Sequence, residues 1–160
     1  MSVLAEIAAA LASEFDIPDA GTLTVIVLRL MTAAVLGGLL GLEREHKNRA
    51  AGFRTHILVS IGSALFVLAP LMAGVDAADV TRVMQGIVSG IGFLGAGAII
   101  KMNGNRVEGV TTAAGIWLTA AIGMSAGMGM EILALVTTVV ALLVLGVIPK
   151  LIRSDPTSKS

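Results

Sequence analysis

The stretch that decides the fold runs from Leu23 to Leu42 and reads LTVIVLRLMTAAVLGGLLGL. A hydrocarbon core about 30 Å thick takes about 20 residues of helix, so this stretch has the length of a membrane span. It contains one charged residue, Arg29. The whole chain agrees, because 56% of its 160 residues are hydrophobic and only 14% are charged, whereas soluble domains carry about 25% charged residues.

Four further apolar stretches follow, and none contains Asp, Glu, Lys or Arg. Short polar connections separate them, as expected where a chain turns back at a membrane surface. We therefore predict an all-α, polytopic membrane protein of about five transmembrane helices. The four additional predicted spans are Ile57–Gly74, Val83–Ile100, Val110–Gly127 and Ile132–Ile148.

Lys and Arg are distributed unevenly over the connections. One set of connections and the C-terminal tail carry nine of them, and the other set carries only Arg82. Basic residues mark the cytoplasmic side, so we predict the N-terminus outside and the C-terminus inside. The predicted parts are a periplasmic amphipathic segment (1–22), a transmembrane domain (23–149) and a short cytoplasmic tail (150–160). Residues 1–21 contain no Lys or Arg, so no secretory signal peptide is expected there.

Small residues concentrate in two of the predicted spans. Gly37 and Gly41 form a GxxxG face on the first span, and such faces let membrane helices approach closely. The third span is richer still, so we expect it to lie centrally and to support a homo-oligomer, most simply a dimer. The residues assigned to helix packing or to a cavity lining are Gly37, Gly41, Gly86, Gly90, Gly92, Gly95, Gly97 and Trp117. Gly90–Gly95 also matches GxGxxG, but a dinucleotide site needs a strand before the motif, which a membrane span lacks.

Arg29 is the one charged residue inside a predicted span. We predict an ion pair with Asp79, which lies at the same membrane level near the start of the third span. The alternative is that Arg29 extends its guanidinium to the outer interface.

The most distinctive polar segment is the connection from Glu43 to His56, in which eight of fourteen residues can carry charge. Glu43 and Glu45 close the first span, and Arg54, Thr55 and His56 open the second. Because the two ends meet in a hairpin, we expect a Glu43–Arg54 contact. The predicted functional site is this cytoplasmic neck, which comprises Glu43, Arg44, Glu45, Arg54, Thr55, His56, Arg106, Thr111 and Thr112. The alternative interpretation is a solvated loop that only sets topology.

The residue pattern gives little support for a metal site, for catalysis or for nucleic-acid binding. Glu43 and His46 have the spacing of a carboxylate-bridged metal site, but such sites need two pairs and further glutamates. No metal site and no cofactor are therefore predicted. No nucleophile elbow or Ser–His–Asp set is present, and a net charge of zero gives no general attraction to nucleic acid.

An internal similarity links the neck to a later turn. Arg49, Gly52 and Thr55 follow the pattern RxxGxxT, and Arg106, Gly109 and Thr112 repeat it. If this is a parallel repeat, both turns lie side by side at the cytoplasmic face, each with a threonine able to cap a helix. Chance similarity between two glycine-rich hairpins is the alternative.

The same residues resemble a known family. The segments GLEREH (41–46), AGFRTHILV (51–59), GIGFLGAG (90–97) and GVTTAA (109–114), with Ile116 and Trp117, are similar to the MgtC/SapB family of bacterial inner-membrane proteins. The resemblance implies a multi-pass domain of about five spans and the short, SapB-like form without a soluble C-terminal domain. It also implies a link to magnesium homeostasis and virulence, and importance for the neck residues other than Arg106 and for Gly92, Gly95, Gly97 and Trp117.

Two functions remain open from the sequence. The leading hypothesis is a non-enzymatic protein that modulates another membrane system or ion homeostasis, with another membrane protein as a possible partner. The alternative is a small oligomeric transporter or channel built around the third span, although no acidic residue lies midway along any span. A pure scaffold is a third interpretation.

Overall fold

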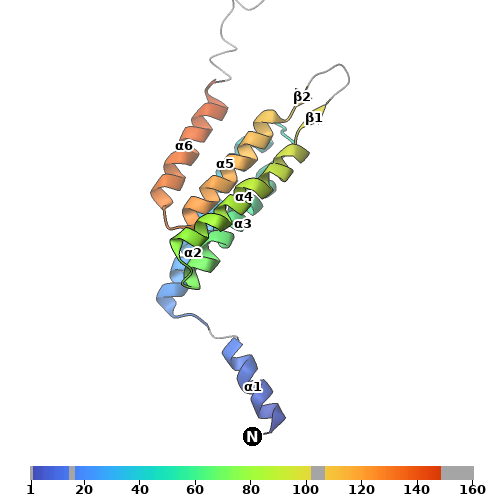
Figure 1. Cartoon of the computed structure of the whole chain (residues 1–160). Helices are drawn as coiled ribbons and strands as arrows, with labels where there is room; N and C mark the ends of the chain where they lie inside the picture. Colours follow the sequence, from blue (N-terminus) through green and yellow to red (C-terminus); the bar gives the residue numbers. More distant parts are fainter. Residues whose placement is uncertain (1, 15–16, 102–106, 149–160) are drawn as a thin grey trace, which may run out of the picture.

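The computed structural model describes residues 2–14, 17–101 and 107–148, and the protein is all-α over that part, as predicted. Five helices form an elongated bundle and one stands apart from it (Figure 1). The helices are α1 (Val3–Glu14), α2 (Ala20–His46), α3 (Phe53–Met72), α4 (Ala77–Gly97), α5 (Val110–Gly127) and α6 (Glu131–Gly146). Two short strands, β1 (Ile100–Lys101) and β2 (Val107–Glu108), pair antiparallel between α4 and α5.

Three of the helices, α2, α3 and α5, are long and apolar enough to cross a membrane by length and composition. The α6 helix is apolar but shorter, and α4 has 21 residues with Asp79 and Arg82 in its first two turns. All five predicted spans thus correspond to helices of the bundle. The number of spans and their orientation stay predictions.

The helix ends differ from the predicted span ends for local reasons. The α2 helix begins at Ala20 because the Asp19 carboxylate caps it, with Oδ1 accepting from the N–H groups of Gly21 (2.9 Å) and Thr22 (3.1 Å). It continues to His46, so Glu43 to His46 are helical rather than part of a loop. The α4 helix begins at Ala77 and is continuous through Gly92–Gly97, so the glycine-rich segment is not unwound.

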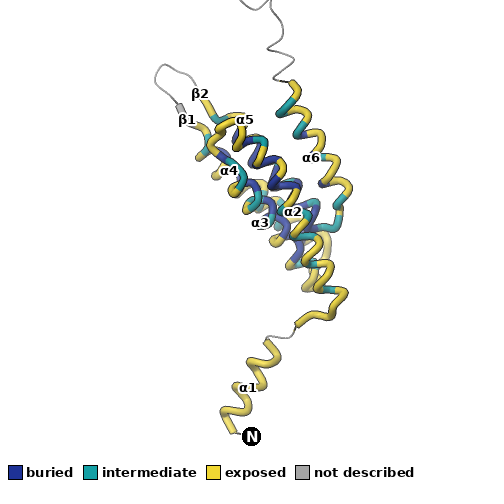
Figure 2. Tube along the Cα trace, turned by 180° about the vertical axis from the view of Figure 1, so that it is seen from behind, coloured by how far each residue is buried: buried dark blue, intermediate teal, exposed yellow. Residues whose placement is uncertain are grey.

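The centre of the bundle is α5, not α4. Helix α5 packs against α2, α3, α4 and α6, and buried residues run along its length (Figure 2). Helix α4 packs mainly against α3 and α5, and its buried residues are Val80, Ile91 and Gly95. The prediction that the glycine-rich third span lies centrally is therefore wrong. Glycine permits close approach but supplies no apolar surface to bury, so it does not by itself draw a helix into the core.

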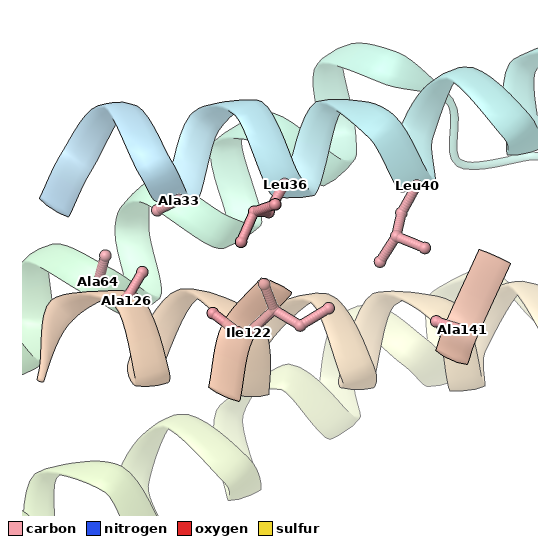
Figure 3. Packing of buried hydrophobic residues seen from close by; sticks show 8 residues of the cluster. Ala33, Leu36, Leu40, Ala64, Ile122, Ala126 and Ala141 are labelled. Carbon is pink, nitrogen blue, oxygen red and sulfur yellow. The ribbon is translucent and has the colours of Figure 1, made fainter. Parts of the chain in front are cut away.

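Three helices meet in a tight contact that we call the glycine seam, formed by Gly37 and Gly41 of α2, Ser60 of α3, and Gly123 and Gly127 of α5. A Cβ on Gly37 would lie 2.6 Å from Ser60 Cβ, and a Cβ on Gly123 would lie 2.2 Å from Ser60 O. Apolar core residues continue this contact, with Ala33, Leu36 and Leu40 facing Ile122 and Ala126 (Figure 3). The backbones of α2, α3 and α5 can approach this closely only because glycine and alanine occupy the contact.

The structure confirms the helix predicted in the N-terminal segment, which is α1. All its described residues are exposed, and its apolar side chains include Val3, Leu4, Ile7 and Leu11. Its position at a membrane interface stays a prediction.

Candidate functional site

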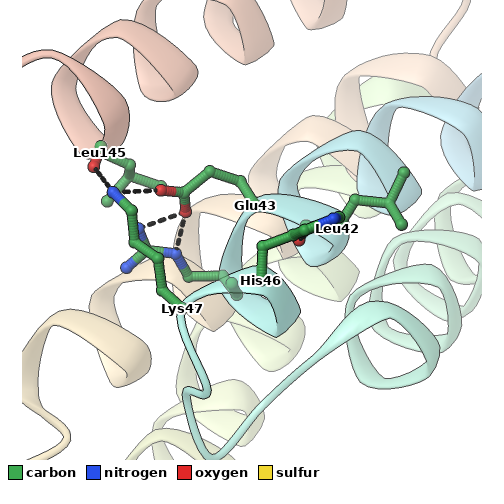
Figure 4. A network of polar contacts seen from close by, with 6 residues as sticks. Leu42, Glu43, His46, Lys47 and Leu145 are labelled. Atoms are coloured by element: carbon green, nitrogen blue, oxygen red, sulfur yellow. Dashed lines mark hydrogen bonds and ion pairs between the residues drawn. The ribbon is translucent and has the colours of Figure 1, made fainter.

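Three charged residues meet at the C-terminal end of α2. The Glu43 carboxylate pairs with the Arg44 guanidinium through Nε and Nη2, and it lies 2.7 Å from Lys47 Nζ. Lys47 Nζ also donates to the Leu145 carbonyl at 2.7 Å (Figure 4). Leu145 lies in the last turn of α6, where carbonyl groups carry partial negative charge that an ammonium stabilises. This network joins the ends of α2 and α6, and Arg44 is only 2% exposed within it.

The structure corrects the expected Glu43–Arg54 contact. Arg54 is exposed on the first turn of α3 and pairs with no acid among the described residues. Glu43 lies one helical turn before Lys47, and this i,i+4 spacing places the two side chains on the same face. The neighbouring Arg44 binds the same carboxylate, so both cations that pair with Glu43 come from the end of α2 rather than from α3. Lys47 was not assigned to the site from sequence, although its i,i+4 spacing from Glu43 was a usable signal.

Glu45 does reach across the hairpin neck. Its Oε2 accepts from the N–H of Phe53 at 2.7 Å, so the carboxylate satisfies the start of α3. A Cβ on Gly52 would lie 2.8 Å from this oxygen, which explains a residue without a side chain there. The contact expected across the hairpin neck is therefore formed by Glu45 rather than by Glu43.

His56 lies deep in the glycine seam. It is 0% exposed, and its Nδ1 donates to the Gly52 carbonyl at 2.9 Å. Its Nε2 faces Gly115, where a Cβ would lie 3.6 Å away, and has no hydrogen-bond partner among the described residues. The hydroxyl of Ser60, one turn later, is also buried and unpartnered. His56 is thus a packing residue of α3 rather than an exposed group of the loop.

The start of α5 lies beside the loop that follows α2. Asn48 and Arg49 of that loop line one cavity of about 350 Å³ together with Glu108, Gly109 and Thr112. The expected consequence of the parallel repeat, two adjacent turns at one end of the bundle, is therefore present. The expected threonine caps are not, because Gly52 and Gly109 occupy the N-cap positions and Thr55 and Thr112 lie inside the helices. Thr111 lines a neighbouring cavity of about 250 Å³, and Arg106 lies outside the described residues.

The glycines assigned to packing fall into two groups. Gly37 and Gly41 pack against α3, and a Cβ on Gly95 would lie at ordinary van der Waals distance, 3.6 Å, from Ala113 Cβ of α5. A Cβ at Gly86, Gly90, Gly92 or Gly97 would meet nothing within 4 Å among the described residues. Trp117 is 50% exposed on the outer surface of α5.

The structure does not contain the predicted Arg29–Asp79 ion pair. Arg29 Nη1 donates to the Gly127 carbonyl at 3.1 Å, and Asp79 Oδ1 lies 3.6 Å from Arg82 Nη1. Gly127 is the last residue of α5, and Gly129 follows in the turn with a φ of +78° and the Arg29 guanidinium against it. Arg29 therefore binds the carbonyl end of α5, where a cation is favoured.

No metal centre is formed by the described part of the chain, since no three His, Cys, Asp or Glu side chains gather there. His46 Nδ1 instead donates to the Leu42 carbonyl at 2.7 Å in its own helix (Figure 4).

Comparison with known proteins places these residues in a family context. The MgtC family profile matches residues 30–154. The chain is 43% identical over 132 residues to "Putative magnesium transporter YhiD" of Escherichia coli, covering 78% of this chain and 61% of that protein. It is 43% identical over 137 residues to "Protein SrpB" of Synechococcus elongatus, covering 78% and 75%. It is also 43% identical over 116 residues to "Protein MgtC" of Salmonella typhimurium, covering 72% and 49%. No solved structure matches the chain.

Proposed function

Because the chain belongs to the MgtC family of membrane proteins, we propose that it is a bacterial inner-membrane protein that modulates another membrane system in magnesium homeostasis and in adaptation to stress or a host. In this proposal it catalyses no reaction itself. One relative is named "Putative magnesium transporter YhiD", which supports the connection to magnesium. Since the chain spans 61% of that relative and 49% of MgtC, the activity of those whole proteins is carried over only as a proposal.

The observation that carries the modulator proposal is the closeness of the glycine seam. A Cβ on Gly123 or Gly127 would lie 2.4 Å or less from a carbonyl oxygen of α3, at Ser60 and Ala64. Helices in such contact leave no water-filled passage between them for a hydrated ion. The Glu43–Arg44–Lys47 network joins α2 to α6 at one end of the same bundle. These features favour a protein that acts through its surface over one that conducts through its centre.

The surface we assign to a partner is the first turn of α3. Arg54 and Thr55 are exposed there, while Glu45 and His56 hold that turn in place through Phe53 and Gly52. A rigid turn that presents a guanidinium and a hydroxyl suits an acidic or polar surface of another membrane protein.

Transport remains the alternative function, and it would require a path between copies. The open face of α4 borders an apolar groove of about 620 Å³ that includes Phe66, Gly86 and Gly90. We propose that a second copy packs on this face to give a homodimer. An apolar groove supplies none of the oxygen ligands that Mg²⁺ needs, which argues against magnesium passing along it.

Two measurements separate modulator from transporter. Purified protein in liposomes loaded with a magnesium-sensitive dye should give no uptake above empty liposomes. Crosslinking in native membranes should capture a partner with the wild type, and R54E should lose it because the charge is reversed. The matched control is R82E, which changes an exposed arginine on α4 and should keep the partner. Magnesium uptake that scales with the amount of protein would replace the modulator proposal with transport.

The dimer can be tested separately, because the chain contains no cysteine. Gly90→Cys, which lines this groove and has open space for a side chain, should form a disulfide-linked dimer in membranes under mild oxidation. Leu133→Cys on the exposed side of α6 is the control and should stay monomeric. Equal crosslinking of both variants would indicate random collision rather than a dimer through α4.

A further inference from the structure

Two polar side chains of α3, His56 and Ser60, are fully buried in the glycine seam, and each is 0% exposed. They lie one helical turn apart, which places them on the same face of α3. A Cβ on Gly41 of α2 would lie 3.0 Å from His56 Cβ. One turn away, a Cβ on Gly37 would lie 2.6 Å from Ser60 Cβ. The two side chains therefore form one enclosed polar pair within a contact that is otherwise apolar.

Each member of this pair has hydrogen-bonding capacity that the described residues do not fill. His56 Nδ1 lies 2.9 Å from the Gly52 carbonyl, and a carbonyl can only accept, so Nδ1 carries the proton. In the neutral ring Nε2 is then an acceptor, and it is buried without a partner in the described structure. The Ser60 hydroxyl is buried and unpartnered in the same way. Buried polar groups are normally hydrogen-bonded, so these two together indicate a bound group.

The space beside His56 limits the size of that group. Gly115 of α5 is itself buried. Apart from its own helix backbone and chain neighbours, a Cβ on Gly115 would meet only one described atom within 4 Å, which is His56 Nε2 at 3.6 Å. Two turns further along α5, a Cβ on Gly123 would lie 2.2 Å from Ser60 O. The contact between α3 and α5 therefore has room for a methyl-sized group beside His56 and none at Gly123.

Water is the molecule of that size whose chemistry suits both partners. A single oxygen can donate a hydrogen bond to the imidazole nitrogen and exchange a second one with the serine hydroxyl. A buried water needs at least about two polar partners, and His56 and Ser60 supply them. A metal ion would need further ligands, and no three His, Cys, Asp or Glu side chains gather in the described ranges.

We propose that one water molecule is bound inside the glycine seam, where it donates to His56 Nε2 and is hydrogen-bonded to the Ser60 hydroxyl. Water at Nε2 keeps the ring in the tautomer whose Nδ1–H holds the Gly52 carbonyl, so Ser60 acts as a positioning residue for the start of α3. An enclosed single water gives no passage through the bundle. The site does not rest on the proposed function, because neither a partner nor Arg54 takes part in it.

Solid-state NMR of the full chain in lipid bilayers tests the site with water as the probe. The chain contains two histidines, so ¹⁵N-histidine labelling gives few signals, and H46Q assigns them. In the wild type, the Nε2 resonance of His56 should lie at the position of an unprotonated nitrogen that accepts a hydrogen bond. The ring should also receive magnetisation transferred from water.

Two substitutions and two matched controls test the partners and the space. S60A removes one partner of the water and should reduce the transfer from water to His56 several-fold. G115A places a methyl group in the space and should abolish the transfer and move the Nε2 resonance to the position of a free nitrogen. The controls are S125A, whose hydroxyl donates within its own helix, and G90A on the open face of α4. Both should behave like the wild type.

Four results would overturn the proposal. A free Nε2 without water transfer in the wild type would mean that the seam is dry, and a protonated Nε2 would mean that the ring is not in the required tautomer. Equal transfer in the wild type and S60A would mean that Ser60 does not hold the water. Losses in the controls as large as those in S60A and G115A would indicate general loosening of the bundle. Size-exclusion chromatography and circular dichroism of each variant establish that it is folded.

Discussion

Glycine lies in a tight interhelical contact in the glycine seam but in open space on the exposed face of α4. In the seam, a Cβ on Gly123 would lie 2.2 Å from a backbone oxygen of α3. On α4, a Cβ on Gly90 would meet nothing within 4 Å in the described structure. Glycine spacing therefore marks where a close contact is possible, and the neighbouring residues decide whether one forms inside a single chain.

The neighbours of the two glycine sets explain the difference. Seam glycines alternate with residues that fill the core, such as Ile122 and Met124 on α5 and Leu36 and Leu40 on α2. The glycines of α4 are accompanied by Phe93 and Leu94, which are exposed. Burial of apolar side chains supplies the free energy that brings helices together in the folded bundle, and the glycines then set how closely they approach.

The largest expected effect comes from adding one methyl group to the seam. Gly123→Ala should destabilise the protein by about 3 kcal/mol, because backbone atoms of Ser60 must move to admit the Cβ. Gly90→Ala is the matched control and should be neutral or stabilising by up to about 1 kcal/mol, the helix-propensity gain. Thermal unfolding followed by size-exclusion chromatography of detergent-solubilised protein measures both. Similar melting temperatures for the two variants would remove the distinction between seam and face.

Removing a charged side chain should also cost more stability inside the bundle than on the exposed face of α4. Arg44→Gln should cost about 2 kcal/mol, because it leaves the largely buried Glu43 carboxylate with Lys47 as its remaining cation. Arg82→Gln on α4 should change stability by no more than about 0.5 kcal/mol, since its ion pair with Asp79 is exposed. The same thermal assay compares them. A larger loss from Arg82→Gln would mean that the face of α4 is buried in the native assembly.

The smallest effect is expected outside both regions, at the start of α2. Hydrogen bonds from the hydroxyl and N–H of Thr22 hold the pKa of the Asp19 carboxyl below its ordinary value. The cap therefore contributes stability above the unfolded-state pKa and loses it as the pH falls through the lower folded-state pKa. Thr22→Val should raise the pKa of Asp19 toward its usual range, as followed by NMR titration in micelles. Thr24→Val, whose hydroxyl donates to the Ala20 carbonyl, should leave it unchanged.

Part of the candidate site could be read from the sequence and part could not. The density of charge between Glu43 and His56 located the end of the bundle where α2, α3 and α6 are joined. The partners were predicted wrongly where they depended on helical phase: Glu43 binds within α2, and Arg29 binds the end of α5. The contacts of Lys47 with Leu145 and of Arg29 with Gly127 each join residues 98 positions apart, which no local spacing specifies.

The sequence by itself determined that this protein is helical and of membrane character, since apolar stretches of sufficient length have few other stable forms in a bilayer. It also determined the family, through short motifs whose order along the chain is specific. Tertiary structure alone decided that α5 rather than α4 lies at the centre. It also decided which glycines touch a neighbour, and it placed Arg49 and Thr112 around one cavity. The physical reason is that helix formation depends on local residues, whereas helix pairing depends on how side chains from distant segments fill the space between two backbones.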